Sequence, residues 1–201
     1  MRRESAVRYY FGDDLEVEGS GSETVLQQMD VSILLWIQEN LRFDFLNGFW
    51  RGITCLGDGG WFWIALGLAL LLYRKTRPVG VTVLLSLAIG ALITNVALKN
   101  MVARIRPYDF TSQIVALLPP QSDFSFPSGH TCASFAAAFV CLQRLPRRWG
   151  IVAVILAGLI AFSRMYLGVH YPTDILGGLL IGFAASWLAC KITGSKILKN
   201  K

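Results

Sequence analysis

Histidine is scarce in this chain, because its 201 residues include only His130 and His170. Asp174 follows His170 by four residues, and Pro172 between them suits the start of a helix. A carboxylate on one imidazole nitrogen fixes the tautomer and leaves the other nitrogen free as a nucleophile. A lone histidine is more often structural, and an aspartate at a helix start can simply serve the helix dipole. Two histidines that both stand beside other polar groups favour catalysis.

The second polar segment reads Pro-Ser-Gly-His and ends at His130. Ser128 suits the N-cap of a helix, and Gly129 lets an anion approach the backbone. Unpaired N–H groups at a helix start bind phosphate oxygens. The alternative explanation of the same residues is a turn that only opens a helix.

Three cations accompany these groups. Lys99 and Arg106 lie in the stretch before Ser128, and Arg164 precedes His170 by six residues. Cations at helix ends are usually anchors that reach the membrane surface. Because Lys99 and Arg106 share a loop with an anion-binding turn, we favour a phosphate clamp. Arg104 has no place in this pattern, and we interpret it as a lipid headgroup contact.

The composition is that of a membrane protein. The chain is 54% hydrophobic and 16% charged, with a mean hydropathy of +0.49, whereas soluble domains are about 25% charged. The aromatic content of 12% also excludes a disordered chain. The net charge is +6, and only three of the acids lie beyond Asp58. The basic residues of the hydrophobic part must therefore face lipid headgroups, a cytoplasmic surface or an anionic substrate.

A helix needs about 20 mostly apolar residues to cross the hydrocarbon core. Five segments approach this length, the third being the shortest: 53–73, 79–98, 128–143, 150–167 and 174–192. Residues 31–50 predict an amphipathic helix that lies at the interface or forms a sixth span. The expected fold is all-α, a polytopic bundle of five to six transmembrane helices with an amphipathic N-terminal helix.

The loop charges predict the orientation. Three basic clusters fall on one side of a five-span bundle: Arg74, Lys75 and Arg77; Arg144, Arg147 and Arg148; and Lys191, Lys196, Lys199 and Lys201. The positive-inside rule makes this side cytoplasmic. The connections 99–127 and 164–173 then face the extracytoplasmic side together. Ionisable groups at membrane depth are costly, so those in these connections are expected to be functional.

The ends of the chain and its cysteines have no expected catalytic role. Residues 1–23 are polar and end near a Gly-Ser-Gly-Ser stretch typical of a flexible tail or linker, natural or left by cloning. No apolar stretch typical of a signal peptide follows the first arginines. Four cysteines show no paired spacing, which favours buried thiols over disulfides or a zinc site.

The polar segments form an ordered pattern. It runs Lys99, six residues, Arg106-Pro107; then Pro127-Ser128-Gly129-His130; then Ser163-Arg164, five residues, His170, three residues, Asp174. This pattern resembles the three-part signature of the type 2 phosphatidic acid phosphatase superfamily. All three parts are complete. The resemblance says little about residues before about Trp50, and it implies one membrane phosphatase domain over residues 24–201.

The resemblance implies roles for the residues of the pattern. His170 would form a phosphohistidine, Asp174 would orient it, and His130 would protonate the leaving oxygen. Lys99, Arg106, Arg164, Ser128 and the amide of Gly129 would hold the phosphate and neutralise its charge. Such a mechanism requires no cofactor or metal, and the sequence has no carboxylate cluster to bind one.

The leading functional hypothesis is a membrane lipid phosphate phosphohydrolase. The compact chain with basic loops resembles bacterial members that act on undecaprenyl pyrophosphate. Phosphatidic acid, phosphatidylglycerol phosphate and lipid A phosphate stay alternatives, because a phosphate clamp recognises only the phosphate. A lipid phosphotransferase would use the same site, and a non-enzymatic lipid-binding protein is least favoured because no motif position is missing. The expected partners are the bilayer and its lipid phosphate, without nucleic acid.

Overall fold

The computed structural model describes residues 7–11, 15–19 and 25–194. Its elements are β1 (Val7–Phe11), β2 (Leu15–Gly19), α1 (Val25–Asn40), α2 (Asp44–Cys55), the short 3-10 helix η1 (Asp58–Gly60), α3 (Trp61–Leu72), α4 (Arg77–Ala91), the π-helix η2 (Leu92–Leu98), α5 (Lys99–Val102), α6 (Pro107–Phe110), α7 (Gly129–Arg144), α8 (Arg147–Tyr166) and α9 (Pro172–Thr193). Between residues 25 and 194 all regular structure is helical, as the sequence predicts.

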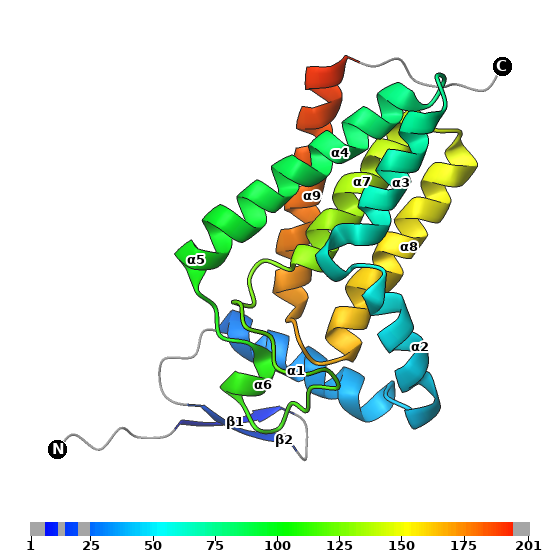
Figure 1. Ribbon diagram of the computed structural model, residues 1–201. Helices are drawn as coiled ribbons and strands as arrows, with labels where there is room; N and C mark the ends of the chain where they lie inside the picture. The colour runs from blue at the N-terminus through cyan, green and yellow to red at the C-terminus, as the bar shows by residue number, and fades with distance from the viewer. Residues whose placement is uncertain (1–6, 12–14, 20–24, 195–201) are drawn as a thin grey trace.

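Helix α7 lies within a bundle formed with α3, α4, α8 and α9 (Figure 1). Its residues Ala136, Ala137 and Ala138 are fully buried. On the facing helix α9, a Cβ added to Gly182 would lie 2.8 Å from the carbonyl oxygen of Cys132. Small residues therefore bring the two backbones close together, which stabilises helix pairs where lipid replaces water.

The helices of the bundle overlap the five expected spans. Three helical segments of the described residues are long and apolar enough to cross a membrane: Arg77–Phe110, Arg147–Tyr166 and Pro172–Thr193. The bent pair Asp44–Cys55 and Asp58–Leu72 adds a fourth if the two helices form one span. Helix α7 has only 16 residues. Because its neighbours surround it, this short helix need not match the full bilayer thickness by itself.

The predicted single helix over residues 31–50 is instead two helices, α1 and α2. Arg42 lies at the break, where its Nε donates to the Tyr166 carbonyl oxygen at 2.7 Å and its Nη1 to the Val115 carbonyl oxygen at 2.6 Å. The hydroxyl of Tyr166 also donates to the Phe43 carbonyl oxygen at 3.2 Å. These long-range bonds hold the turn between the helices, and periodicity along the chain carries no information about them.

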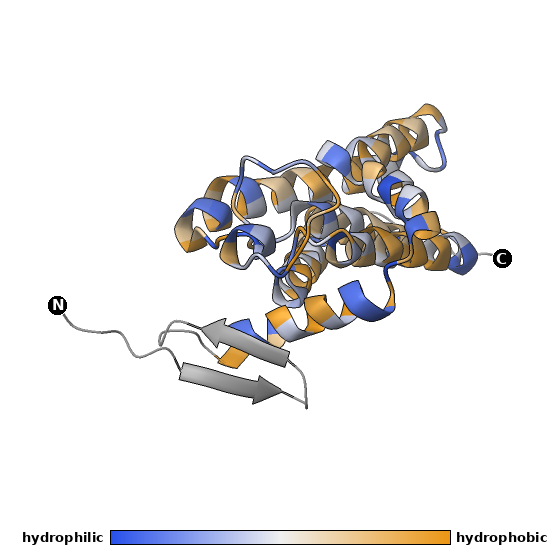
Figure 2. Cartoon of the chain, turned by 90° about the horizontal axis from the view of Figure 1, so that it is seen from below, coloured by the Kyte–Doolittle hydropathy of each residue, from blue (hydrophilic) through white to orange (hydrophobic). Residues whose placement is uncertain are grey.

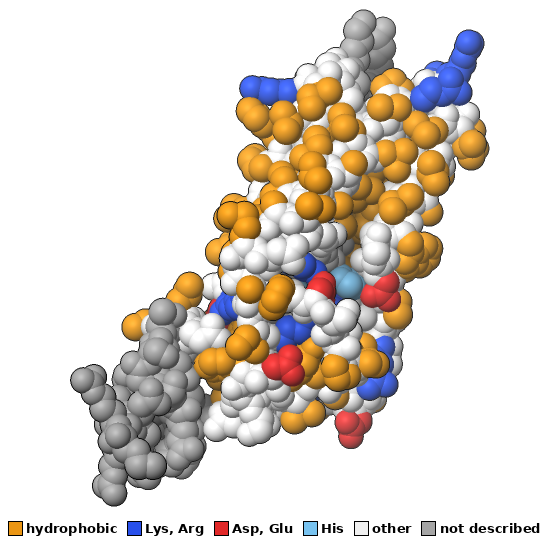
Figure 3. All heavy atoms as spheres, turned by 60° about the vertical axis from the view of Figure 1, so that its left-hand side comes forward, with side chains coloured by type: hydrophobic (Ala, Val, Ile, Leu, Met, Phe, Trp, Pro, Cys, Tyr) orange, Lys and Arg blue, Asp and Glu red, His pale blue; other side chains and the backbone are white. Residues whose placement is uncertain are grey.

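Helix α1 lies across one end of the bundle, with hydrophilic residues toward its carboxyl end (Figures 1 and 2). The apolar side chains of Val31, Leu34, Leu35 and Ile37 on this helix are buried. Its other large apolar side chains are exposed, as are many around the bundle in Figure 3. Those on α1 are Val25, Leu26, Met29, Ile33 and Trp36. An apolar outer surface of this extent is typical of a protein surrounded by lipid.

The connections α3–α4 and α7–α8 and the carboxyl end of α9 share the opposite end of the bundle (Figure 1). Arg74, Lys75, Arg147 and Arg148 are exposed there. Arg144 does not belong to this exposed cluster, contrary to expectation. It is buried, and its Nη2 donates to the Cys190 carbonyl oxygen at 2.8 Å. The expected basic residues beyond 194 lie outside the described residues.

Within the expected N-terminal tail, β1 and β2 pair as an antiparallel hairpin with Val7 opposite Gly19. Residues 1–6, 12–14 and 20–24 lie outside the described part of the chain. Most of the expected Gly-Ser-Gly-Ser linker falls in the last of these ranges. The four cysteines are free. Cys132, Cys141 and Cys190 are buried thiols as expected, whereas Cys55 is exposed.

Candidate active site

The candidate residues gather at the end of the bundle that carries α1, α5 and α6 (Figure 1). Two local features bring them there. Ala103 adopts a left-handed conformation with φ of 47°, which ends α5 and turns the chain toward Arg106. Ser128 begins α7 in an extended conformation, and its backbone N–H donates to the Asp174 carbonyl oxygen at 3.1 Å. The starts of α7 and α9 are thereby joined.

His170 and Asp174 form the pair that the sequence predicts. His170 Nδ1 lies 3.4 Å from Asp174 Oδ2, and their side chains are 2% and 0% exposed. The same carboxylate oxygen accepts from the Tyr171 backbone N–H at 2.9 Å and from the Ser125 hydroxyl. With Oδ2 held in place, Asp174 can orient the imidazole and leave Nε2 available for chemistry.

The surroundings of His170 favour its neutral form. Burial lowers the pKa of His170 to about 3, and the nearby Arg164 and Arg106 lower it as well. The hydrogen bond and charge of Asp174 act in the opposite direction and are outweighed. At neutral pH the imidazole is therefore uncharged, which is the state a nucleophile requires.

Arg104 is not a lipid headgroup contact, as the sequence suggested, but a link between three elements. Its Nη1 donates to Asp174 Oδ1 at 2.8 Å and its Nη2 to Asp30 Oδ2 at 2.6 Å. Its guanidinium also stacks 3.9 Å above the centre of the Tyr171 ring. Because both acids are buried, a planar guanidinium that reaches both of them satisfies charges that otherwise destabilise the fold.

Lys99 and Arg106 converge on one carboxylate, that of Asp123. The Lys99 Nζ donates to one oxygen of Asp123 and the Arg106 Nη2 to the other. Burial alone would raise the pKa of Asp123, but the bonds and charges of these cations lower it to about 2. The two cations thus hold an oxyanion, which is the arrangement a phosphate clamp needs.

Ser128 and Gly129 take the positions expected of an anion-binding helix start. The Ser128 hydroxyl accepts from the Thr131 backbone N–H at 3.4 Å and from the Thr131 hydroxyl at 3.0 Å. A Cβ added to Gly129 would lie 3.5 Å from Asn95 Oδ1 and 3.9 Å from Lys99 Nζ. Gly129 therefore leaves open backbone beside a cation, while the buried hydroxyl of Ser128 caps its own helix.

Arg164 is 1% exposed at the end of α8. Its Nη1 donates to Thr54 Oγ1 at 2.7 Å. Its Nε is buried without a hydrogen-bond partner among the described residues. Buried guanidinium N–H groups are nearly always paired, so this Nε is a donor that remains available to an anion.

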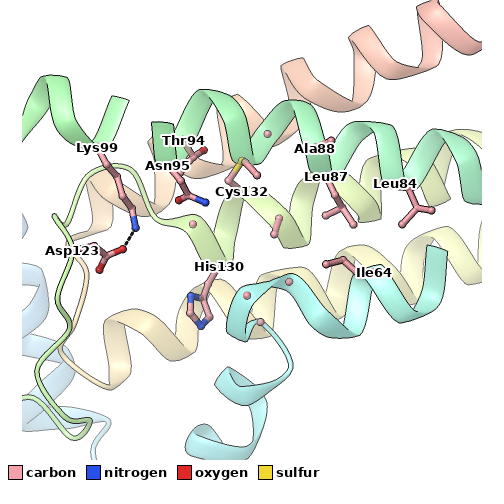
Figure 4. A pocket seen from close by; sticks show the side chains of 17 residues that line it. Ile64, Leu84, Leu87, Ala88, Thr94, Asn95, Lys99, Asp123, His130 and Cys132 are labelled. Carbon is pink, nitrogen blue, oxygen red and sulfur yellow. Dashed lines mark hydrogen bonds and ion pairs between the residues drawn. The ribbon is translucent and has the colours of Figure 1, made fainter. Parts of the chain in front are cut away.

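A cavity of 570 Å³ opens between these groups and the α3–α4 pair. Lys99, Asp123, Gly129 and His130 form its polar end (Figure 4). Apolar side chains line the remainder, among them Ile64, Leu84, Leu87 and Ala88. His170, Arg106 and Arg164 do not line this cavity, but Arg106 binds Asp123, which does. A cavity with a polar end and an apolar remainder suits a lipid whose phosphate lies at the polar end and whose chain lies along the apolar part.

Three partners of the expected residues do not follow from the sequence pattern. Asp123 binds the two cations, Ser125 binds Asp174, and Asp58 Oδ1 lies 2.8 Å from His130 Nε2. The rarity of acids in the hydrophobic part of the chain is the signal that could have pointed to Asp123. Ser125 carries no comparable signal. Asp58 is an acid inside the first expected span, residues 53–73, and that cost was its only signal.

Known proteins with similar sequences and structures indicate the family of this chain. Residues 79–197 match the family described as the PAP2 superfamily. An undecaprenyl-diphosphatase of Sulfolobus acidocaldarius is 33% identical over 138 residues, covering 69% of this chain and 66% of that protein. Phosphatidylglycerophosphatase B of Bacillus subtilis is 35% identical over 161 residues, covering 74% and 75%.

A solved structure is also similar. The crystal structure of a transmembrane PAP2 type phosphatidylglycerolphosphate phosphatase from Bacillus subtilis matches with a TM-score of 0.70 and 32% identity, covering 89% of this chain and 91% of that one. The membrane helices, the anion-binding cations and these relatives define the class: a membrane lipid phosphatase. The chain belongs to the PAP2 superfamily.

Proposed function

We propose that this chain removes phosphate from a membrane lipid through a phosphohistidine on His170. The observation that carries the proposal is the buried pair of His170 and Asp174 next to cations that already hold an oxyanion. A neutral imidazole oriented through Nδ1 presents Nε2 as the nucleophile. One membrane domain, over residues 24–201, would carry the whole site.

In the first step, His170 Nε2 attacks phosphorus. The bond from phosphorus to the lipid oxygen breaks, its electron pair stays on that oxygen, and His130 supplies the proton. The lipid leaves as an alcohol, or as a monophosphate if the substrate is a diphosphate. In the second step, water gives a proton to His130 while its oxygen attacks phosphorus, and the electron pair of the P–N bond returns to His170.

Charge neutralisation would come from this chain's own side chains. Lys99 and Arg106 would exchange the carboxylate of Asp123 for phosphate oxygens, and the unpaired Nε of Arg164 would bind a third oxygen. The backbone N–H of Gly129 would donate to the phosphate, and the positive end of the α7 helix dipole would attract it. Fixed charges of this kind stabilise the phosphoryl transition state without reorganisation during the reaction.

For the substrate we propose undecaprenyl pyrophosphate. The apolar part of the cavity is lined by residues of α3 and α4, which suits the chain of a lipid. The similarity to an undecaprenyl-diphosphatase supports this choice. Phosphatidylglycerol phosphate is the second candidate, because the Bacillus subtilis relatives named for it are equally similar in sequence.

The test is phosphate release by the purified protein in detergent. Undecaprenyl pyrophosphate should be hydrolysed with a kcat/KM at least about tenfold above those for phosphatidylglycerol phosphate, phosphatidic acid and lipid A, equivalent to about 1.4 kcal/mol of transition-state binding. A higher kcat/KM for phosphatidylglycerol phosphate would refute undecaprenyl pyrophosphate as the preferred substrate and support phosphatidylglycerol phosphate instead. Release only after addition of an acceptor alcohol would indicate a phosphotransferase, and no release from any of them would refute the proposal.

A further inference from the structure

We propose that Asp58 is a positioning residue for His130, holding the ring and its positive charge so that the ring protonates the leaving oxygen. The inference rests on the proposed function, which assigns that proton transfer to His130. Asp58 lies on η1, before residues 79–197 that match the superfamily. The structure therefore adds a residue that the three-part pattern does not contain.

The geometry of the His130 ring suits this role. Asp58 Oδ1 lies 2.8 Å from His130 Nε2. His130 Nδ1 has no hydrogen bond to any described residue, and the ring lines the cavity (Figure 4). The side chains of His130 and Asp58 are 16% and 58% exposed. One edge of the ring is thus held by a carboxylate, while the other remains available to a substrate oxygen.

The backbone that carries Asp58 is shaped to approach His130 closely. A Cβ added to Gly57 would lie 2.6 Å from His130 Cδ2, so only glycine lets this backbone reach the ring. Gly59 and Gly60 follow with φ of 56° and 70°, values that residues with a side chain rarely adopt. The segment 57–60 is therefore a glycine turn that brings one carboxylate against one edge of His130.

The charges around the ring also bear on this role. Burial disfavours a positive charge on His130, and so do Arg164 on α8 and Lys99 on α5. Asp123 lines the same cavity, but both of its oxygens bind cations. Asp58 is the carboxylate that hydrogen-bonds the ring directly, so its charge acts against these effects and partly offsets them.

The proton transfer then balances. In the first step, the protonated ring gives its Nδ1 proton to the leaving oxygen, which has received the electron pair of the broken P–O bond. The ring becomes neutral and keeps its Nε2 proton in the bond to Asp58. In the second step, water returns a proton to Nδ1. Asp58 stays ionised throughout and never contacts the substrate.

Leaving groups that differ in basicity test this role. An alkyl phosphate such as dodecyl phosphate needs protonation of its alkoxide, whereas p-nitrophenyl phosphate releases a stable anion. Asp58→Asn should lower kcat/KM for dodecyl phosphate about 100-fold and for p-nitrophenyl phosphate less than about fivefold. His130→Asn should show the same selective loss. Adding Asp58→Asn to His130→Asn should cost less than about twofold more, because the two residues act as one unit.

The pH profile gives a second measurement. The wild-type rate on dodecyl phosphate should fall with rising pH as the ring loses its proton. In Asp58→Asn this fall should begin about one pH unit lower, because the stabilising charge is gone. Asp58→Glu keeps the carboxylate and should retain the wild-type pH profile, and it serves as the test if Asp58→Asn does not fold. Asp109→Asn, which removes an exposed carboxylate on α6, is the control and should change neither readout.

Equal losses on both substrates, or no loss on either, would overturn the positioning role of Asp58 while leaving the phosphatase function intact. Additive losses in the double variant would overturn it too. If the wild-type protein released no phosphate from any substrate, the proposed function itself would fail. An active wild type with an unchanged rate in Asp58→Asn would instead refute only the role of Asp58.

Discussion

At the scale of single residues, Asp123 reveals how strongly Lys99 and Arg106 attract an oxyanion. The cations hold the carboxylate in its charged form even though it lies partly buried. A phosphate that enters the clamp must displace this carboxylate, and it brings more negative charge than Asp123 does. The same cations therefore explain both the resting arrangement and the proposed binding of substrate.

The proposed nucleophile gives the first prediction. His170→Ala should lower phosphate release by about 10⁴-fold or more, because no second imidazole lies beside Asp174 among the described residues. Asp174→Asn should leave a slow enzyme, since the imidazole remains but loses the charge that orients it. Phosphate release from a lipid diphosphate measures both. A near-normal rate for His170→Ala would refute the phosphohistidine.

The second prediction concerns metal ions and vanadate. If Lys99, Arg106 and Arg164 neutralise the transferring phosphoryl group, then chelation with EDTA should change kcat less than about twofold. Vanadate should inhibit in competition with substrate, because it takes the geometry of pentacoordinate phosphorus on the same cations. A strict requirement for added magnesium would contradict this distribution of charge.

The third prediction follows from the burial of His170. Its pKa in the folded protein is lowered to about 3 from 6.5, so the unfolded chain binds a proton that the folded chain does not. Stability should fall as the pH drops below about 6.5, by up to about 1.4 kcal/mol per pH unit. His170→Asn lacks this titration. Thermal unfolding followed by tryptophan fluorescence between pH 7 and pH 5 should show a smaller loss in the variant, and parallel curves would contradict the assignment.

At the scale of elements, Arg104 joins the segment between α5 and α6 to α1 and α9. Its guanidinium bonds Asp30 on α1 and Asp174 on α9, and the Arg104 carbonyl oxygen accepts from the Ser125 backbone N–H at 2.9 Å. The site therefore depends on a helix, α1, that lies outside the part of the chain matched by the superfamily. This dependence explains why α1 is held across the end of the bundle.

The fourth prediction tests this connection. Arg104→Ala should destabilise the protein by about 3 kcal/mol, because it leaves two buried carboxylates without their cation. Activity should fall as well, since Asp174 loses a partner. Arg104→Lys cannot reach both acids at once and should recover only part of the stability. Arg148→Ala, at an exposed position of α8, is the control in denaturant unfolding. Equal stability of the two alanine variants would contradict the linking role of Arg104.

At the scale of the whole molecule, the candidate site and the described basic loops occupy opposite ends of the bundle (Figure 1). By the positive-inside rule, the end with Arg74, Lys75, Arg147 and Arg148 lies in the cytoplasm. We therefore propose that the site faces the extracytoplasmic side and draws lipid phosphate from the outer leaflet. Exposed apolar side chains between the two ends agree with such a placement across the bilayer (Figure 3).

The fifth prediction tests this orientation with single cysteines at Ser112 and Arg147, both exposed and at opposite ends. The background carries Cys55→Ser, which removes the exposed native thiol and keeps the buried ones. A membrane-impermeant thiol reagent applied to intact cells should label Ser112→Cys and not Arg147→Cys. Permeabilised cells should label both, which is the control for reactivity. The reverse pattern in intact cells would move the site to the cytoplasmic face.

Much of this organisation was predictable because it is local in the chain. His170 and Asp174 are four residues apart across a helix start, so their pairing follows from helix geometry and the positions of Pro172 and Asp174. Ser128 takes the N-cap that its residue type predicts. The helices α4, α7, α8 and α9 match expected spans because long apolar runs are helical in lipid whatever their neighbours.

The tertiary structure decided what depends on packing between distant residues. Asp58 and His130 are 72 positions apart, and Arg104 and Asp174 are 70 apart. No spacing rule connects such pairs, because only the assembled helices bring them together. The break between α1 and α2 is of the same kind, since Arg42 holds it through carbonyl oxygens far along the chain. Residue types and their local spacing thus determined the chemistry and the helical spans. Long-range packing decided which carboxylate binds each cation and each histidine.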